Sequence, residues 1–110
     1  REMPSIFHLE HPIGSVIGQA NFSNFLVLYQ GVTIGGDLKC RYPSFQEGVA
    51  LFAKSSIIGN CKIGSNCAVG ANTQLFQKDL ADNNSISLRN DSFQYIKEMN
   101  WSVKEKFFKS

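Results

Sequence analysis

The side chains best suited to proton transfer lie near the start of the sequence. His8 and His11 are its two histidines, and Glu10 directly precedes His11. Histidine changes charge near neutral pH, so His11 is a candidate general base and Glu10 a candidate carboxylate partner. Adjacent residues of an extended segment point to opposite sides, so Glu10 need not orient His11. A purely structural role for this histidine therefore stays open.

The same histidines bear on metal binding. His8 and His11 are three residues apart, and Cys40 would be a distant third ligand. Zinc sites use three or four protein ligands, so we expect no metal site here.

Pro12 restricts His11 to an extended conformation, and Gly14 then permits a turn. We therefore expect His11 to lie on a rigid stretch of chain.

Large apolar residues recur at every sixth position through the middle of the chain. The series is Phe45, Leu51, Ile57, Ile63, Val69 and Leu75, and Phe22, Leu28 and Ile34 extend it toward the N-terminus. Four positions after the members of the main series come the small or β-branched residues Val49, Ser55, Cys61, Cys67 and Thr73. A period of six fits neither a lone strand nor an α-helix. It predicts an all-β solenoid, a parallel β-helix whose coils bury their apolar row by stacking.

Residues 36–44 interrupt this repeat with turn-forming and charged residues. We therefore expect a loop expelled from the coils. Binding residues collect on such loops, and a tolerated surface insertion is the alternative. Cys61 and Cys67 fall on the small-residue row, which favours buried thiols over a disulfide. Cys40, inside the loop, is predicted to be a free thiol.

The hexads stop after Leu75, and a different pattern follows. Asn90 or Asp91 can cap a helix. Positions three and four apart, apolar except for Asn100, would then lie on one helix face: Phe93, Ile96, Asn100, Val103 and Phe107. We expect a β-helix domain over residues 1–88 and a helix over residues 89–110 that covers the last coil. The basic aromatic end could instead contact a membrane surface or a partner chain.

Composition narrows the classes of function. The chain has 110 residues and a net charge of +2, and its basic residues are scattered apart from a cluster at the end. No electrostatic footprint for nucleic acid is present. The longest apolar runs, such as Phe25–Tyr29, are too short to cross a bilayer, and no apolar signal-peptide core is found. We expect a soluble cytoplasmic protein.

Three segments carry a resemblance to a known family. They are His11-x-x-Gly14, the run QGVTIGG at residues 30–36, and Glu47-Gly48-Val49 before the hexads. Residues 8–76 resemble the catalytic half of bacterial serine acetyltransferases and related hexapeptide acyltransferases. The resemblance implies a left-handed β-helix that forms a homotrimer, with acetyl-CoA bound as a substrate along the groove between adjacent prisms.

The resemblance also implies catalytic roles. His11 would be the general base that deprotonates the acceptor hydroxyl. In the family a carboxylate pairs with this histidine, and its position would fall before Arg1. If residues precede Arg1 in the protein, that carboxylate would lie among them; otherwise Glu10 substitutes for it or His11 works without this partner. The backbone N–H groups of Gly35 and Gly36 would stabilise the negative oxygen of the tetrahedral intermediate.

Binding roles follow in the same way. Arg41 would bind the carboxylate of the acceptor through its planar guanidinium, with Tyr42 beside it where the family usually has histidine. Ala53 and Ala71 match small residues whose backbone meets the pantetheine arm of acetyl-CoA. Ala68 stands where the family usually has a basic residue. These departures lie mostly on the acceptor side. They therefore weaken the prediction that serine is the acceptor more than the prediction that acetyl-CoA is the donor.

The sequence thus predicts an acetyl-CoA-dependent O-acetyltransferase acting on a small acceptor. Two alternatives stay open. The acceptor could be a hydroxyl or amine of a surface-polysaccharide sugar, or the chain could be a non-catalytic β-helix that serves as a trimerisation scaffold, since a fold alone does not imply activity. The joint presence of His11, Gly14, Gly35, Gly36 and Arg41 favours the enzyme, because a scaffold does not require them.

Overall fold

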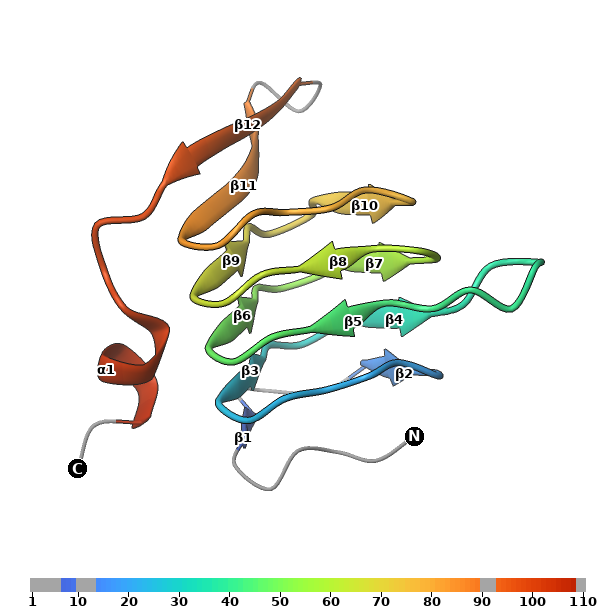
Figure 1. Cartoon of the computed structure of the whole chain (residues 1–110), viewed down its shortest axis with the longest axis horizontal. Coiled ribbons are helices and arrows are strands. Elements are labelled where there is room, and N and C mark those ends of the chain that lie inside the picture. Colours follow the sequence, from blue (N-terminus) through green and yellow to red (C-terminus); the bar gives the residue numbers. More distant parts are fainter. Residues whose placement is uncertain (1–6, 10–13, 90–92, 109–110) are drawn as a thin grey trace.

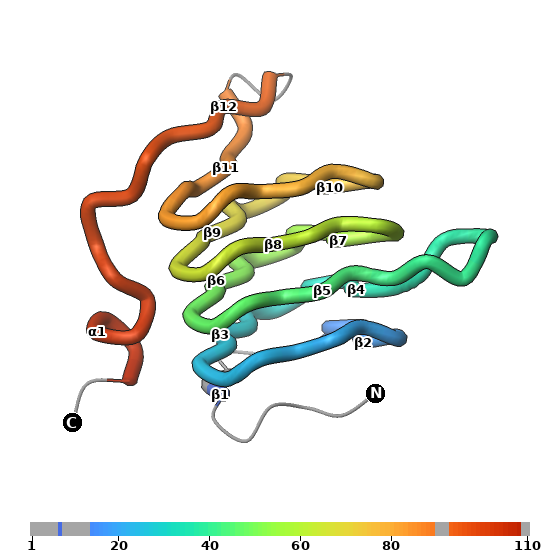
Figure 2. The backbone as a smooth tube through the Cα atoms, in the orientation of Figure 1, coloured from blue at the N-terminus to red at the C-terminus, as the bar shows by residue number. Residues whose placement is uncertain are grey.

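The computed structural model describes residues 7–9, 14–89 and 93–108. Within these ranges the chain winds into stacked coils with three faces, and short strands form a β-sheet along each face (Figure 1). The tube view shows the coils stacked in sequence order, with the last residues running back along one side (Figure 2). This is the solenoid that the six-residue period predicts.

The three sheets differ in length. The first, in spatial order, contains β1 (Phe7–Leu9), β3 (Leu26–Leu28), β6 (Val49–Leu51), β9 (Cys67–Val69), β11 (Asn84–Arg89) and β12 (Phe93–Glu98). The second contains β2 (Val16–Ile17), β4 (Thr33–Gly35), β7 (Ser56–Ile58) and β10 (Gln74–Phe76). The third pairs β5 (Ser44–Phe45) with β8 (Lys62–Ile63), and the helix α1 (Val103–Phe108) follows the strands.

Parallel pairing stacks the hexad residues into one core. Ile34 pairs with Ile57, which pairs with Leu75 on the next coil. The buried members of the series are Leu28, Ile34, Phe45, Leu51, Ile57, Ile63, Val69 and Leu75. The small-residue row, from Val49 to Thr73, is buried as well. The predicted core is confirmed, and so are the buried free thiols of Cys61 and Cys67 and the exposed free thiol of Cys40.

One coil is longer than the coil that follows it. Leu26 pairs with Val49 across the longer coil, whereas Val49 pairs with Cys67 across the shorter one. The additional residues lie between the end of β4 and the start of β5, where the chain projects away from the prism (Figure 1). The predicted excursion loop is confirmed, although Ser44 already belongs to β5.

The predicted C-terminal helix is wrong over residues 93–98. These residues form β12, which pairs antiparallel with β11, for example through Ile96 opposite Ile86. The physical reason is that β11 would otherwise end the sheet with unpaired backbone groups, and the aromatic and β-branched residues of FQYIKE suit a strand. The proposed caps Asn90 and Asp91 lie outside the described residues.

The actual helix is short and packs elsewhere than predicted. Val103 of α1 is fully buried against Val27, Ala50 and Ala68, which lie on the outer face of the first sheet. Helix α1 therefore covers a flank of the solenoid and not the end of its last coil (Figure 1). Ser102 begins the helix, because its side-chain oxygen accepts the N–H of Glu105 at 3.3 Å.

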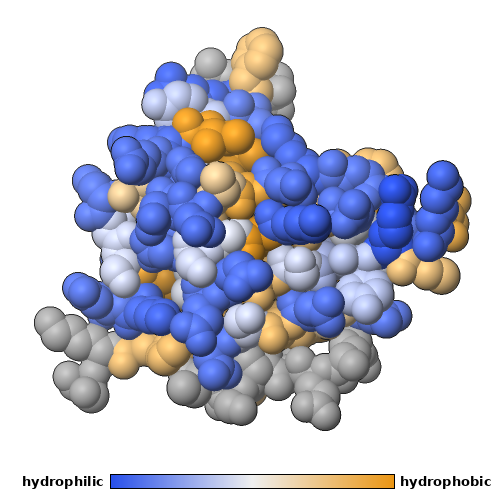
Figure 3. Space-filling model, in the orientation of Figure 1, coloured by the Kyte–Doolittle hydropathy of each residue, from blue (hydrophilic) through white to orange (hydrophobic). Residues whose placement is uncertain are grey.

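Most of the face in Figure 3 is hydrophilic, with apolar residues visible in a strip near its middle. In the described ranges no helix is long and apolar enough to cross a membrane.

Candidate functional site

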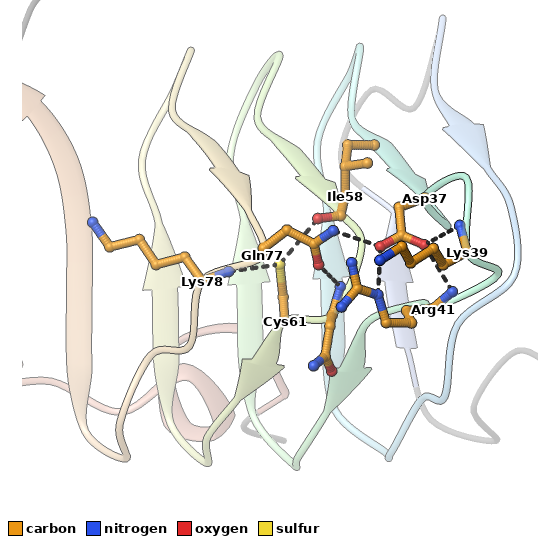
Figure 4. A network of polar contacts seen from close by, with 8 residues as sticks. Asp37, Lys39, Arg41, Ile58, Cys61, Gln77 and Lys78 are labelled. Carbon is orange, nitrogen blue, oxygen red and sulfur yellow. Dashed lines mark hydrogen bonds and ion pairs between the residues drawn. The ribbon is translucent and has the colours of Figure 1, made fainter.

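The excursion loop is held in shape by one carboxylate. Asp37 Oδ1 accepts the backbone N–H groups of Lys39 and Arg41, each at 2.9 Å. Asp37 Oδ2 accepts Nε–H of Arg41 at 2.8 Å. The backbone closes the same turn, since Asp37 N–H donates to the Arg41 carbonyl at 2.9 Å. Asp37 therefore fixes both the path of the loop and the base of the Arg41 guanidinium (Figure 4).

Gln77, at the corner after β10, reaches the loop from a later coil. Its Nε2–H donates to Asp37 Oδ2, and its Oε1 accepts the N–H of Asn60 (Figure 4). The side chain crosses the intervening corner at Gly59, which has φ +84°. A Cβ at that position would lie 2.6 Å from Gln77 Oε1, so only glycine leaves room for the crossing.

These contacts set the electrostatics of the loop. The hydrogen bond from Gln77, followed by those from Arg41, holds the pKa of Asp37 well below its usual range. The Asp37 side chain is only 6% exposed, whereas that of its partner Arg41 is 48% exposed. The loop thus presents the positive member of the ion pair to solvent and keeps the negative member inside.

A shallow pocket of about 180 Å³ lies between this loop and the end of β10. Its lining residues are Asp37, Leu38, Lys39, Arg41, Phe76 and Gln77. Phe76 is 66% exposed, and Leu38 at the loop tip is exposed as well. The pocket therefore offers cationic groups beside an apolar wall, which suits a small organic anion.

The structure brings three of the predicted site residues together at the base of the loop. A Cβ on Gly36 would lie 3.1 Å from the Arg41 carbonyl and 3.8 Å from Cβ of Tyr42. The two ends of the loop therefore approach each other closely at Gly36, where a side chain would be tight. Gly35 is the last residue of β4, and its carbonyl accepts the N–H of Gly59 at 3.0 Å.

Two other predicted residues lie at a different corner. Ala53 and Ala71 belong to adjacent coils at the corner before β7 and β10, where the N–H of Asn72 donates to the Ala53 carbonyl at 2.9 Å. Strands β7 and β10 separate this corner from the excursion loop. The structure therefore stacks these alanines on each other and does not bring them to Arg41.

The predicted catalytic pair His11 and Glu10 lies outside the described residues. His8 belongs to β1 and pairs with Val27 of β3. Across the described part of the chain, the structure has no group of three or more His, Cys, Asp or Glu side chains that could hold a metal ion.

Sequence reasoning missed Asp37 and Gln77. A signal for Asp37 was available, because aspartate in a short loop accepts backbone N–H groups two or more residues ahead and stands four residues before Arg41. Gln77 carried no comparable signal, since its contacts depend on how the coils stack.

Comparison with curated proteins finds serine acetyltransferases, although no family model matches the chain. The enzyme of Staphylococcus epidermidis is 40% identical over 73 residues, which are 63% of this chain and 34% of that protein. The enzyme of Staphylococcus aureus is 37% identical over the same shares of both chains. The chain thus spans about a third of the length of the curated relatives it matches.

Solved structures give the same result. Serine acetyltransferase from Brucella abortus superposes with a TM-score of 0.76 at 26% identity, covering 87% of this chain and 38% of that one. The Neisseria gonorrhoeae enzyme in complex with serine gives 0.72 at 31% identity, covering 79% and 36%. A serine acetyltransferase in complex with CoA gives 0.68 at 25% identity, covering 83% and 37%. The fold is therefore the left-handed β-helix of these proteins.

Proposed function

From this similarity to the hexapeptide-repeat part of serine acetyltransferases, we propose that the chain is an acetyl-CoA-dependent O-acetyltransferase. It moves an acetyl group to a hydroxyl of a small acceptor, and L-serine is the first candidate. The observation that carries the proposal is the joint match in sequence and in coil geometry to serine acetyltransferases, which include structures in complex with CoA and with serine.

In the proposed mechanism His11 is the general base. It takes the proton of the acceptor hydroxyl while the oxygen attacks the acetyl carbon of the thioester. The tetrahedral intermediate then collapses, the carbon–sulfur bond breaks, and the proton on His11 passes to the leaving thiolate. Glu10 is proposed as the carboxylate that stabilises the charged imidazole.

The remaining roles concern binding. The N–H groups of Gly35 and Gly36 are proposed to stabilise the oxyanion. Arg41 is proposed to bind the acceptor carboxylate, with Tyr42 beside it. The cationic pocket beside Phe76 supports this placement, because a guanidinium at a protein surface recognises planar carboxylates through paired hydrogen bonds.

The donor is proposed to lie along the coils. The backbone at the stacked corner of Ala53 and Ala71 would meet the pantetheine arm of acetyl-CoA. A groove between prisms requires a neighbouring chain, so we propose a homotrimer.

We further propose that residues 1–88 form the catalytic domain, with residues 89–110 as an appended segment, and that the protein acts in the cytoplasm.

Release of free thiol from acetyl-CoA tests the proposed function. The chain is assayed with L-serine and, in parallel, with nucleotide- and lipid-linked sugars. Turnover with L-serine is the expected result. Turnover with a sugar alone would replace the acceptor in the proposal, and absence of turnover with every acceptor would contradict the function.

A pair of histidine variants tests the general base. His11→Ala is expected to lower kcat by at least about a hundredfold, a typical contribution of general-base catalysis. His8→Ala is the matched control and is expected to keep the unmodified rate within about twofold. An unchanged rate for His11→Ala would show that another group accepts the proton.

A further inference from the structure

The guanidinium of Arg41 is fixed along one of its edges. Asp37 Oδ2 accepts Nε–H at 2.8 Å, and the adjoining backbone of Arg41 is tied to Asp37 Oδ1. A guanidinium carries five N–H donors, of which four are on the two terminal amino groups. The bond to Asp37 therefore uses the Nε edge of the guanidinium. A further anion would then be bound by the two terminal amino groups.

Gln77 supplies the second hydrogen bond to the same carboxylate oxygen. Asp37 Oδ2 thus accepts from both the Gln77 amide and the Arg41 guanidinium. The Gln77 side chain is itself fixed at its other end, because Oε1 accepts the N–H of Asn60. The carboxylate is consequently held from the loop on one side and from the corner of a later coil on the other (Figure 4).

This arrangement solves a physical problem for a long side chain. Arginine loses rotamer entropy when it is fixed, which weakens binding unless the side chain is already ordered. A neutral amide donor is suited to the task, because it stabilises the charge on Asp37 without competing for an incoming anion. The Asp37 side chain is only 6% exposed, and the guanidinium of Arg41 balances its charge.

We propose that Gln77 is a positioning residue that acts through Asp37, and that it holds Arg41 so that an acceptor carboxylate is bound end-on by the two terminal amino groups. This inference rests on the proposed function, in which Arg41 binds the acceptor. The proposal adds Gln77, from the last hexad coil, to a site whose charged residues lie on the excursion loop. It also states which edge of the Arg41 guanidinium is bound by Asp37 and which edge binds the acceptor.

Steady-state kinetics test the consequence for substrate. Gln77→Glu keeps the shape of the side chain and its acceptor for Asn60 but replaces the donor to Asp37 with an oxygen. Gln77→Glu and Gln77→Ala are both expected to raise the acceptor KM by about three- to tenfold, while the acetyl-CoA KM changes by less than about twofold. Gln74→Ala, on the exposed side of β10, is the matched control and should change neither constant.

A merely structural role would give a different pattern. Loss of folding would lower the amount of active protein and leave both KM values of the remaining enzyme unchanged. An acceptor KM that stays within about twofold in both Gln77 variants of an active enzyme would overturn the proposal.

A second measurement does not depend on turnover. The ¹⁵N heteronuclear NOE of the Arg41 Nε–H group, assigned by its disappearance in Arg41→Lys, reports whether the guanidinium is ordered. A rigid signal is expected in the unmodified chain and in Gln74→Ala, and a mobile one in both Gln77 variants. A signal equally rigid in all of them would overturn the positioning role. Mobility that depends on Gln77 in a chain without acetyltransferase activity would support the positioning and contradict only the proposed function.

Discussion

The side-chain amide of Gln77 donates a hydrogen bond to the carboxylate of Asp37, 40 residues earlier in the chain. The bond connects the corner after β10 to the excursion loop and passes across the corner at Gly59. A β-helix stacks residues that are one coil apart, whereas this contact bridges two coils at once. The shape of the loop therefore depends on a residue that the loop itself does not contain.

Gly59 is predicted to be essential for this bridge. Gly59→Ala would place a Cβ 2.6 Å from Gln77 Oε1 at a backbone φ of +84°, so both the crossing and the local backbone are strained. The expected loss is about 1–3 kcal/mol in the free energy of unfolding, measured by urea denaturation at a fixed protein concentration. Gly35→Ala is the control, because its nearest neighbour would be 3.9 Å away. Equal stability of the two variants would show that the crossing is not tight.

The carboxyl group of Asp37 is predicted to stay ionised in acid. Its hydrogen bonds with Gln77 and Arg41 lower its pKa in the folded state below the unfolded value of about 3.9. A depressed pKa contributes stability that is fully present above the unfolded pKa and is lost as the pH falls through the folded one. The ¹³C chemical shift of the Asp37 carboxyl carbon should accordingly stay constant from pH 7 down to about pH 4. A titration centred near pH 4 would mean that the loop network does not form.

The hexad core is predicted to dominate stability. Ile57 is fully buried between Ile34 and Leu75 on the neighbouring coils. Ile57→Ala should cost about 2–5 kcal/mol in the free energy of unfolding, because it leaves a cavity between coils. Ile96→Ala, at a 49% exposed position of β12, should cost less than about 1 kcal/mol. A similar cost at both positions in denaturant unfolding would contradict the assignment of the core.

The contact of α1 with the first sheet is predicted to hold the C-terminal segment in place. Val103→Asp would bury a carboxylate against Val27, Ala50 and Ala68, so the segment should detach while the coils stay folded. Trypsin cleavage after Lys104 should then become at least about tenfold faster, because an opened segment is accessible to the protease. Glu98→Ala, at an exposed position of β12 outside the helix, is the control. Unchanged cleavage of Val103→Asp would show that other contacts fix the segment.

The sequence predicted the parts of this fold that repeat. Core residues such as Ile57 and Leu75 can be recognised in the sequence, because each coil buries the side chain at every sixth position. The helix predicted over residues 93–98 failed because the spacing of Phe93 and Ile96 fits a helical period, although their residue types suit a strand as well, and only the free edge of β11 decides between them. The true helix start was readable from the Ser102-x-x-Glu105 pattern.

The candidate site was predictable only in part. The loop and Arg41 follow from the interruption of the hexads and from the resemblance to serine acetyltransferases. The roles assigned to His11 and Glu10 stay predictions, because these residues lie outside the described ranges. The Gln77–Asp37 contact could not be predicted, since it requires the register of three coils, the left-handed conformation of Gly59 and one particular side-chain direction.

Direct detection of the transferred acetyl group tests the central claim. The chain is incubated with acetyl-CoA labelled with ¹³C in the acetyl group and with L-serine, and the products are resolved by mass spectrometry, with His11→Ala in a parallel reaction. Labelled O-acetylserine is expected from the unmodified chain, and under the same conditions the variant is expected to form at least about a hundredfold less product. If the protein is shown to be folded but serine stays unlabelled and acetyl-CoA stays intact, the proposed activity toward serine is contradicted.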